Sequence, residues 1–297
     1  MKRYAIFVGA DKNYLPRLVM LLNSLAELGY NWDLHIISPD IPPSSQETLL
    51  SAFSFSLMRW HELRTAGRSA RLVKFERYRV MAEYSGNYDA CVLLDADMIA
   101  VRPFWRFFEM VENTDTLLAP VEQIQRNLVR FTCDGIHLPD QRMHWMVSSA
   151  PFFFCGKRVS KQIGELYRCM IKVLPSPGDG PPYNVALWKC GLTEQIVKLP
   201  AYCWNGVNST YFNPGTAIRE TDAGWYADTG EEVYIIHGRW DVPGFRNWYD
   251  RELERMARLA GLSEKGLEIR RKRMDGLIRS FSALARKYRH GPPVWIG

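Results

Sequence analysis

The first 95 residues alternate short apolar segments with segments whose apolar residues recur at helical spacing. The apolar segments predict strands at 3–8, 33–38, 54–60 and 88–94. The amphipathic segments predict helices at 14–28, 42–53 and 71–84, and Gly29 is expected to stop the first of them. Strands that alternate with helices favour an α/β fold with a mostly parallel, doubly wound sheet flanked by helices.

Two of the predicted strands end on polar residues. The first strand leads into Gly9-Ala10-Asp11, and the fourth leads into Asp95-Ala96-Asp97. In such a sheet, ligands bind beyond the carboxyl ends of the strands. We therefore expect both segments to lie on the same rim of the sheet, where a ligand would bind.

The rest of the chain is more mixed. Its pattern predicts helices near 104–111, 159–173 and 184–190, and strands near 116–121, 150–155 and 233–237. The segment 122–145 is irregular, and the Pro- and Gly-rich segment 175–182 is expected to be a rigid loop. From Asn247 onward the chain is predicted to be helical and basic.

Composition adds limits to this picture. The chain has 297 residues, and its net charge of +6 comes from the tail, where residues 251–297 hold 12 Lys and Arg against 5 Asp and Glu. No apolar stretch is long enough to cross a membrane, and no signal peptide is evident. The six scattered cysteines form no Cys-x-x-Cys pair, which indicates reduced thiols and a cytoplasmic protein.

The pair Asp95 and Asp97 is the strongest chemical signal. Two carboxylates at the end of an apolar strand repel each other, and a divalent cation would relieve that repulsion. Hard oxygen ligands favour Mg²⁺ or Mn²⁺. Two alternatives stay open: a strand end whose aspartates cap the next turn, and the nucleophile motif of haloacid-dehalogenase-like phosphatases. The second fits less well, because that motif normally follows the first strand of its fold.

Four segments carry a resemblance to one enzyme family, in the family's order. They are Gly9-Ala10-Asp11-Lys12-Asn13-Tyr14, Ser69-Ala70-Arg71-Leu72, Val92-Leu93-Leu94-Asp95-Ala96-Asp97 and Tyr234-Ile235-Ile236-His237-Gly238. They resemble, respectively, the Ala-Ala-Asp-Asp-Asn-Tyr loop, the Tyr-Ala-Arg-Leu segment, the Tyr-Leu-Asp-x-Asp strand end and the His-Tyr-x-Gly strand end of glycosyltransferase family 8. That family includes glycogenin and the lipopolysaccharide galactosyltransferases and has the GT-A fold.

The resemblance implies a role for each segment. Asp95, Asp97 and His237 would bind Mn²⁺ or Mg²⁺. The nucleotide of a UDP-sugar donor would be held by Ala10, Asp11, Asn13, Tyr14, Arg71, Ala96 and Gly238. Simpler interpretations remain: Asp11 as a helix cap, Arg71 in a surface salt bridge, and His237 as a structural residue.

The sequence also departs from the family pattern. Asp179 is present where the family orients the donor sugar, but Gly180 replaces the glutamine beside it. Phe154 stands where an asparagine is expected. The lysine that follows the late histidine is missing, and Arg239 is predicted to supply the phosphate contact instead. Asp179 and Arg239 are thus the expected catalytic residues.

The expected reaction moves a hexose or related sugar from a UDP-sugar to a hydroxyl, with retention. We expect a GT-A catalytic domain at 1–246, with a nucleotide-binding half at about 1–121 and an acceptor half at about 122–246. A basic helical extension would follow at 247–297. The acceptor is predicted to be a glycan or lipid-linked glycan, with protein or modified DNA as alternatives.

The basic tail leaves several partners open. An amphipathic basic helix there suits peripheral contact with a membrane, packing in a homodimer, or binding of nucleic acid. A degenerate fold that binds UDP without turnover is the alternative that is not an enzyme.

Overall fold

The computed structural model describes residues 2–63, 71–123, 132–133, 136–137, 145–172, 180–200, 218–227 and 229–237, together with 268 and 272. The predicted tail at 247–297 lies outside these residues except for Glu268 and Lys272, which are helical and form an ion pair of 2.7 Å. Among the described residues, no helix has the length and apolar character needed to span a membrane.

The described chain is built around a mostly parallel sheet. Seven strands follow the order β11-β6-β10-β4-β1-β2-β3, and β9 pairs with β6 as an eighth strand. Strands β10 and β9 run antiparallel to their neighbours, whereas the other pairings are parallel. The strands of this sheet are β1 (Tyr4–Gly9), β2 (Asp33–Ser38), β3 (Leu57–Glu62), β4 (Ala90–Asp95), β6 (Leu117–Gln123), β9 (Trp145–Val147), β10 (Phe152–Phe154) and β11 (Ile196–Pro200).

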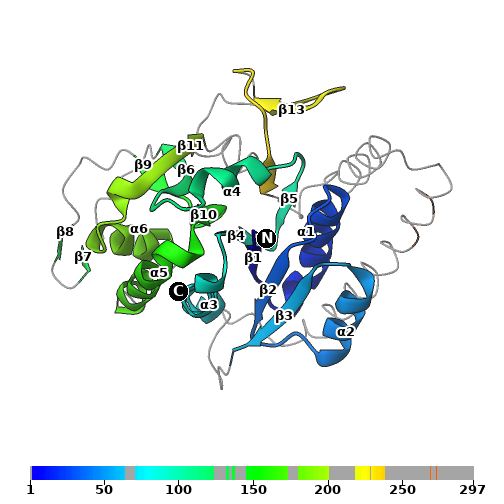
Figure 1. The fold of residues 1–297 in the computed structure, drawn as a ribbon, viewed down its shortest axis with the longest axis horizontal. Coiled ribbons are helices and arrows are strands. Elements are labelled where there is room, and N and C mark those ends of the chain that lie inside the picture. Colours follow the sequence, from blue (N-terminus) through cyan, green and yellow to red (C-terminus); the bar gives the residue numbers. More distant parts are fainter. Residues whose placement is uncertain are drawn as a thin grey trace.

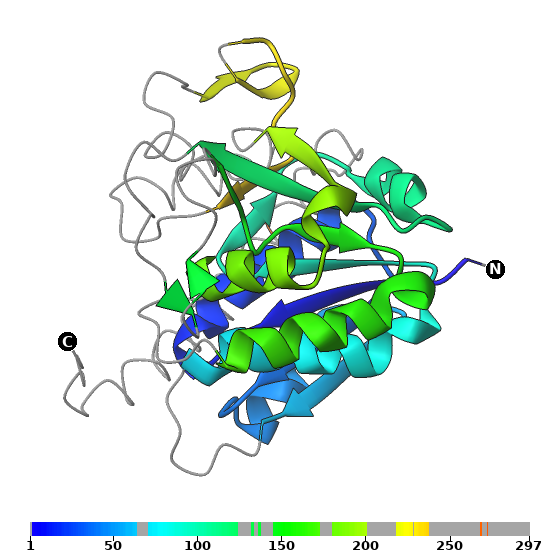
Figure 2. The same ribbon diagram turned by 90° about the vertical axis from the view of Figure 1, so that its left-hand side faces the viewer.

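Helices cover both faces of the sheet. Figure 1 shows α3, α5 and α6 on one side, and α1, α2 and α4 on the other. The layer of α3, α5 and α6 is held by extensive contacts between α3 and α5 and between α5 and α6, as the turned view in Figure 2 makes clear. The helices are α1 (Leu15–Glu27), α2 (Pro43–Ala52), α3 (Arg71–Tyr84), α4 (Trp105–Val111), α5 (Gly156–Lys172) and α6 (Gly180–Lys189), with 3-10 turns η1 (Lys12–Tyr14), η2 (Ser85–Asn87) and η3 (Thr193–Gln195).

Three small two-stranded sheets complete the described part. They pair β5 (Met98–Ala100) with β14 (Ile235–His237), β7 (Thr132–Cys133) with β8 (Ile136–His137), and β12 (Ile218–Thr221) with β13 (Gly224–Ala227). The pair of β5 and β14 positions the site, because it brings residue 237 to the end of β4. The sequence pattern does not predict β5, β7, β8, β9, β11, β12 or β13, and β7 and β8 lie within the segment 122–145 that it predicts to be irregular.

Local sequence explains most of these elements. The helix α1 buries Leu18, Leu21, Leu22 and Leu25, the four residues that define its apolar stripe. It stops at Gly29, whose φ of 80° is a conformation that glycine adopts without strain. Strand β10 is the continuous run Phe152–Phe154, and its three rings are all buried, as expected for a strand covered on both faces.

The predicted loop at 175–182 is wrong at its C-terminal end. The Pro-rich loop was expected to extend to Pro182, but α6 already begins at Gly180. Proline is well tolerated in the first turn of a helix, since the amide hydrogens there have no partner within the helix. The two prolines therefore start the helix rather than delay it. Four cysteines whose side chains are described are free thiols: Cys91 and Cys155 are buried, and Cys169 and Cys190 are half-buried.

Candidate active site

The carboxyl ends of β1 and β4 lie side by side. The two strands are parallel neighbours, and Gly9 is the partner of Asp95 in their register. The segments Gly9-Ala10-Asp11 and Asp95-Ala96-Asp97 therefore leave the sheet at the same rim, as the sequence predicts. This places two polar loops at the position where α/β sheets bind ligands.

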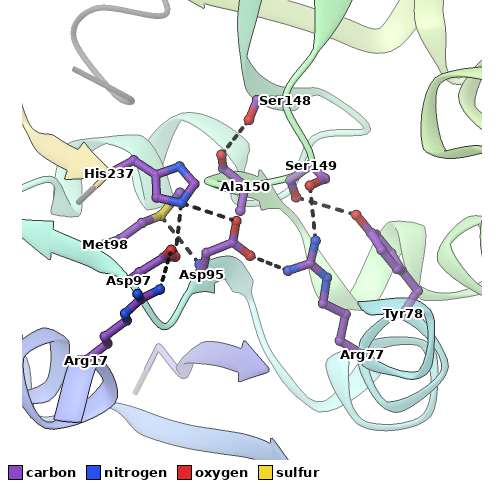
Figure 3. Close-up of polar contacts among 10 residues, drawn as sticks. All are labelled: Arg17, Arg77, Tyr78, Asp95, Asp97, Met98, Ser148, Ser149, Ala150 and His237. Carbon is purple, nitrogen blue, oxygen red and sulfur yellow. Dashed lines mark hydrogen bonds and ion pairs between the residues drawn. The ribbon is translucent and has the colours of Figure 1, made fainter. Parts of the chain in front are cut away.

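His237, the third expected metal ligand, also lies at this rim, although it is far from Asp95 and Asp97 in the sequence. Strand β14 pairs with β5 antiparallel, and His237 is the partner of Met98. Its Nε2 lies 2.9 Å from Asp97 Oδ1 and 4.0 Å from Asp95 Oδ2. One ligand atom from each of Asp95, Asp97 and His237 lies within 4.8 Å of the others. The three residues thus form a cluster that could hold a metal ion (Figure 3).

Electrostatics keep Asp97 ionised. Burial by itself raises the pKa of this carboxyl, but the hydrogen bond with His237 and the nearby charge of Arg17 outweigh that effect, and its pKa lies below the ordinary value. An ionised carboxylate can only accept, so His237 Nε2 carries the hydrogen of this bond.

Two arginines contact the carboxylate pair. Arg77, on α3, donates to Asp95 Oδ1, and its other terminal nitrogen donates to Ser149 Oγ at 3.0 Å. Arg17, in the first turn of α1, lies 3.6 Å from Asp97 Oδ2. Figure 3 shows the two guanidinium groups reaching the carboxylates from opposite sides. Each carboxylate therefore has its own cation in addition to His237.

A cavity of about 300 Å³ opens at this rim. The side chains around it combine acids, bases and one aromatic ring. Its lining residues are Gly9, Ala10, Asp11, Tyr14, Lys74, Arg77, Asp95, Ala96, Asp97 and His237. Seven of the residues expected from the sequence meet there, namely Ala10, Asp11, Tyr14, Asp95, Ala96, Asp97 and His237.

Asp11 and Tyr14 also have local roles. Asp11 Oδ1 accepts a hydrogen bond from the Tyr14 amide at 3.1 Å, which caps the turn η1. Asp11 therefore caps the 3-10 turn and not α1, whose N-cap residue is Tyr14 and which has no side-chain cap, and Asp11 also lies on the cavity wall. Tyr14 is 37% exposed, and the Arg17 guanidinium lies 4.7 Å from its ring centroid.

Other expected residues are not brought to the site by what the structure describes. Asp179, Gly238 and Arg239 lie outside the described residues, as do the side chains of Asn13 and Arg71. The backbone of Asn13 lies in η1, and Arg71 is the first residue of α3. The roles predicted for these five residues stay predictions.

Sequence reasoning missed three cations near the carboxylates: Arg17, Lys74 and Arg77. A signal for two of them exists, since Arg71, Lys74 and Arg77 recur at every third position of a predicted helix and so share one side of it. Spacing alone does not say whether that side faces solvent or the sheet. Arg77 is nearly fully buried, which shows that its part of the helix faces inward.

The segment around Asn184 has a structural role. The Asn184 side chain accepts a hydrogen bond from the Val147 amide at 2.8 Å and donates to the Val147 carbonyl oxygen at 3.0 Å. It therefore ties α6 to β9 through both backbone groups of one residue. These two bonds help to hold α6 against the sheet, together with its packing on α5.

Comparisons with known proteins agree with this fold. No protein-family model matches the sequence, and no curated protein matches it. The structure is similar to three solved glycosyltransferase structures, each at 14% identity. They are WbbM, described as a bifunctional glycosyltransferase, with a TM-score of 0.57 over 85% of this chain; GlyE of Streptococcus pneumoniae TIGR4, at 0.53 over 96%; and an active-site mutant of LgtC, at 0.58 over 88%.

These matches differ in extent. This chain spans 50% of the WbbM chain and 64% of the GlyE chain, but 98% of the LgtC chain. Identity at this level informs on architecture, while function depends on the site itself. The fold implied by the four matching segments is confirmed: the chain has the GT-A fold of these glycosyltransferases.

Proposed function

We propose that this protein is a metal-dependent glycosyltransferase that moves a hexose or related sugar from a UDP-sugar to a hydroxyl acceptor. The observation that carries the proposal is the convergence of Asp95, Asp97 and His237 on the wall of a cavity at the rim of a GT-A sheet. The same cavity is lined by Asp11 and Tyr14 of the loop after β1, so a metal and a nucleotide would share one site.

The chemistry of the donor set fits a divalent ion such as Mn²⁺ or Mg²⁺. Two carboxylates offer hard oxygen atoms, and a neutral imidazole is a ligand that suits transition metals. When bound, the ion would neutralise negative charge that builds up as UDP leaves. His237 must give up its hydrogen bond to Asp97 to serve as a ligand through Nε2, because an imidazole coordinates metal through an unprotonated nitrogen.

The remaining cavity residues suit the donor nucleotide. Asp11 could accept a hydrogen bond from the uracil ring, and Tyr14 offers an exposed ring for stacking. Lys74 lines the wall with positive charge that a diphosphate would neutralise, whereas the charge of Arg77 is paired with Asp95. Asp179 is proposed to orient the donor sugar, and Arg239 to contact the phosphates.

The acceptor is proposed to be a glycan or lipid-linked glycan, and the transfer to proceed with retention. The domain at 1–246 would carry the activity, and the basic extension at 247–297 would bring the enzyme to its acceptor. Transfer to protein or to modified DNA would be recognised by the labelled product in an acceptor screen.

Release of UDP from a panel of UDP-sugars in the presence of Mn²⁺ tests the proposal. We expect at least one sugar to be hydrolysed or transferred, and Asp97→Asn to abolish the reaction. Asp115→Asn is the matched control, because Asp115 precedes β6 and pairs with Arg158 at the opposite end of the sheet. Full activity of Asp97→Asn would disprove the site, whereas UDP binding without turnover of any sugar would favour the degenerate fold.

A further inference from the structure

The two arginines at the carboxylate pair are held very differently. The Arg77 side chain is 3% exposed, and the Arg17 side chain is 30% exposed. Arg77 contacts Asp95, whereas Arg17 contacts Asp97. Figure 3 shows the two arginines on separate helices, Arg17 on α1 and Arg77 on α3. The difference in exposure suggests that one cation is fixed and the other is free to leave.

Arg77 is the fixed cation. It is bonded to Asp95 and to Ser149, and the surrounding protein excludes water from its side chain. Breaking these bonds would leave a cation in a poorly solvated environment, which is strongly unfavourable. Arg77 is therefore expected to stay on Asp95 whatever binds in the cavity.

Arg17 is placed less favourably. It is the third residue of α1, and the dipole of a helix disfavours a cation in the first turn. Its separation of 3.6 Å from Asp97 exceeds a normal hydrogen bond, and its side chain is only partly buried, so this pair is weaker than the pair of Arg77 and Asp95. Its guanidinium also lies against Tyr14 on the cavity wall. A rotation of the side chain would move the charge from Asp97 to a ligand in the cavity.

We propose that Arg17 is an exchangeable counter-ion. It neutralises Asp97 while no metal is present, leaves that carboxylate when a divalent ion binds, and then contacts the diphosphate of the nucleotide. This inference rests on the proposed function. Arg17 lies outside the four segments that resemble the family. The inference gives it a role in the order in which the metal ion and the nucleotide bind and in the coupling between their affinities.

The charge balance of the site explains the coupling. Arg17 and Arg77 already neutralise the two carboxylates, so a divalent ion alone must compete with Arg17 and creates an excess of positive charge. A diphosphate supplies the missing negative charge and gives Arg17 a new partner. The ion and the nucleotide should therefore bind weakly when alone and strongly together. By linkage, each must raise the affinity of the other by the same factor.

The variant Arg17→Gln tests this coupling with a readout other than turnover. Free Mn²⁺ is followed by electron paramagnetic resonance during titration of the full chain, with and without UDP. We expect Arg17→Gln to bind Mn²⁺ alone about tenfold more tightly, because the competing charge is gone. We expect it to bind UDP in the presence of Mn²⁺ about tenfold more weakly. Arg17→Lys retains the charge and should stay close to the wild type in both titrations.

Lys12→Gln is the matched control. Lys12 lies on the same rim, but its charged partner is Asp40 at 3.7 Å, so its loss should change the Mn²⁺ affinity by less than about twofold. Opposite changes in the two titrations are the signature of an exchangeable counter-ion, since general damage to the site would weaken both. Thermal melting of each variant verifies that it is folded.

The outcomes separate the two claims. If Arg17→Gln leaves the affinity for Mn²⁺ alone unchanged or lowers it, while the wild type binds Mn²⁺ with UDP, the role of Arg17 is wrong and the proposed function stands. If the wild type binds no Mn²⁺ even with UDP, the proposed metal site is wrong, and the role of Arg17 falls with it.

Discussion

Arg77 provides a sharp test of how the site is held. In Arg77→Met the apolar stem is kept but the charge is lost, and with it the contacts to Asp95 and Ser149. We expect the protein to fold with lower stability and Asp95 to lose its fixed orientation. The sequence pattern does not identify Arg77 as part of the site, so this substitution tests a contact that only the structure reveals.

The size of the effect follows from the burial of each partner. Both hydrogen bonds of Arg77 use its charged guanidinium, and a bond of this kind contributes about 1.5–3 kcal/mol. Asp95 is 27% exposed, so water partly replaces the lost contact and lowers the total. We therefore expect the free energy of unfolding to fall by about 2–3 kcal/mol, or the Tm by roughly 4–10 °C. A misaligned Asp95 should also lower kcat/KM by about 100-fold.

Chemical denaturation and calorimetry measure the stability, and UDP release measures the activity. The control is Arg79→Met on the same helix, where Arg79 is 43% exposed and pairs with Glu76 and Glu83. That change should lower the free energy of unfolding by about 0.5 kcal/mol or less. Equal effects of the two substitutions on stability and activity would refute the account of Arg77.

Two further predictions concern stability. Burial, followed by the mutual repulsion with His61, lowers the pKa of His35 to about 3, and burial lowers the pKa of His61 to about 4. Both pKa values lie below the value near 6.5 in the unfolded chain, so the unfolded chain binds more protons as the pH falls. The free energy of unfolding should therefore fall from pH 6.5 toward pH 4, by at most about 1.4 kcal/mol per pH unit for each histidine. Urea denaturation at pH 7 and pH 5 should show a smaller difference in His35→Gln than in the wild type, and an equal difference would contradict the assignment. A Cβ at Gly156 would lie 1.9 Å from the Ser85 carbonyl oxygen, so Gly156→Ala should lower the free energy of unfolding by about 2 kcal/mol or more. Gly164→Ala on the same helix meets only ordinary contacts and should not lower it. Thermal melting of the two variants checks the difference.

The hydrogen bonds of His35 explain why it resists protonation. Tyr88 donates its hydroxyl hydrogen to Asp33 at 2.9 Å, so its oxygen accepts from His35 Nε2 at 2.8 Å. The other nitrogen, Nδ1, must then accept from His61 Nε2 at 2.9 Å. A proton on Nδ1 would require His61 Nε2 to change from donor to acceptor within a buried network, in addition to the burial and the repulsion by His61 that lower the pKa of His35.

The first half of the fold could be predicted because its signals are local. Strand β2 and helix α3 begin and end at the predicted residues, since apolar periodicity and flanking polar residues define both. The rim that joins Gly9 to Asp95 follows from the parallel order of these strands. The order of the matching segments predicts that Asp95, Asp97 and His237 meet, although their approach depends on the pairing of β5 with β14. The apolar run at 233–237 predicts β14, but the three-residue β5 leaves no periodic signal, and the two strands pair across more than a hundred residues.

Side-chain direction was the main quantity that the sequence could not supply. Arg17 and Arg77 both lie in predicted helices, but only the packed structure places one in the first turn beside Asp97 and buries the other beside Asp95. Phe154, which stands at an expected asparagine position, is fully buried within β10. Packing thus explains this departure from the family pattern, and nothing in the described structure explains the replacement of glutamine by Gly180.

The central claim is that Asp95, Asp97 and His237 hold a divalent ion that binds the donor diphosphate. Crystals grown with MnCl₂ and UDP, measured near the manganese absorption edge, test it most directly. The account predicts one anomalous peak in contact with both carboxylates, with His237 Nε2 and with UDP phosphate oxygens. Bound UDP with no anomalous peak at these three residues, or with the manganese held elsewhere, would contradict it.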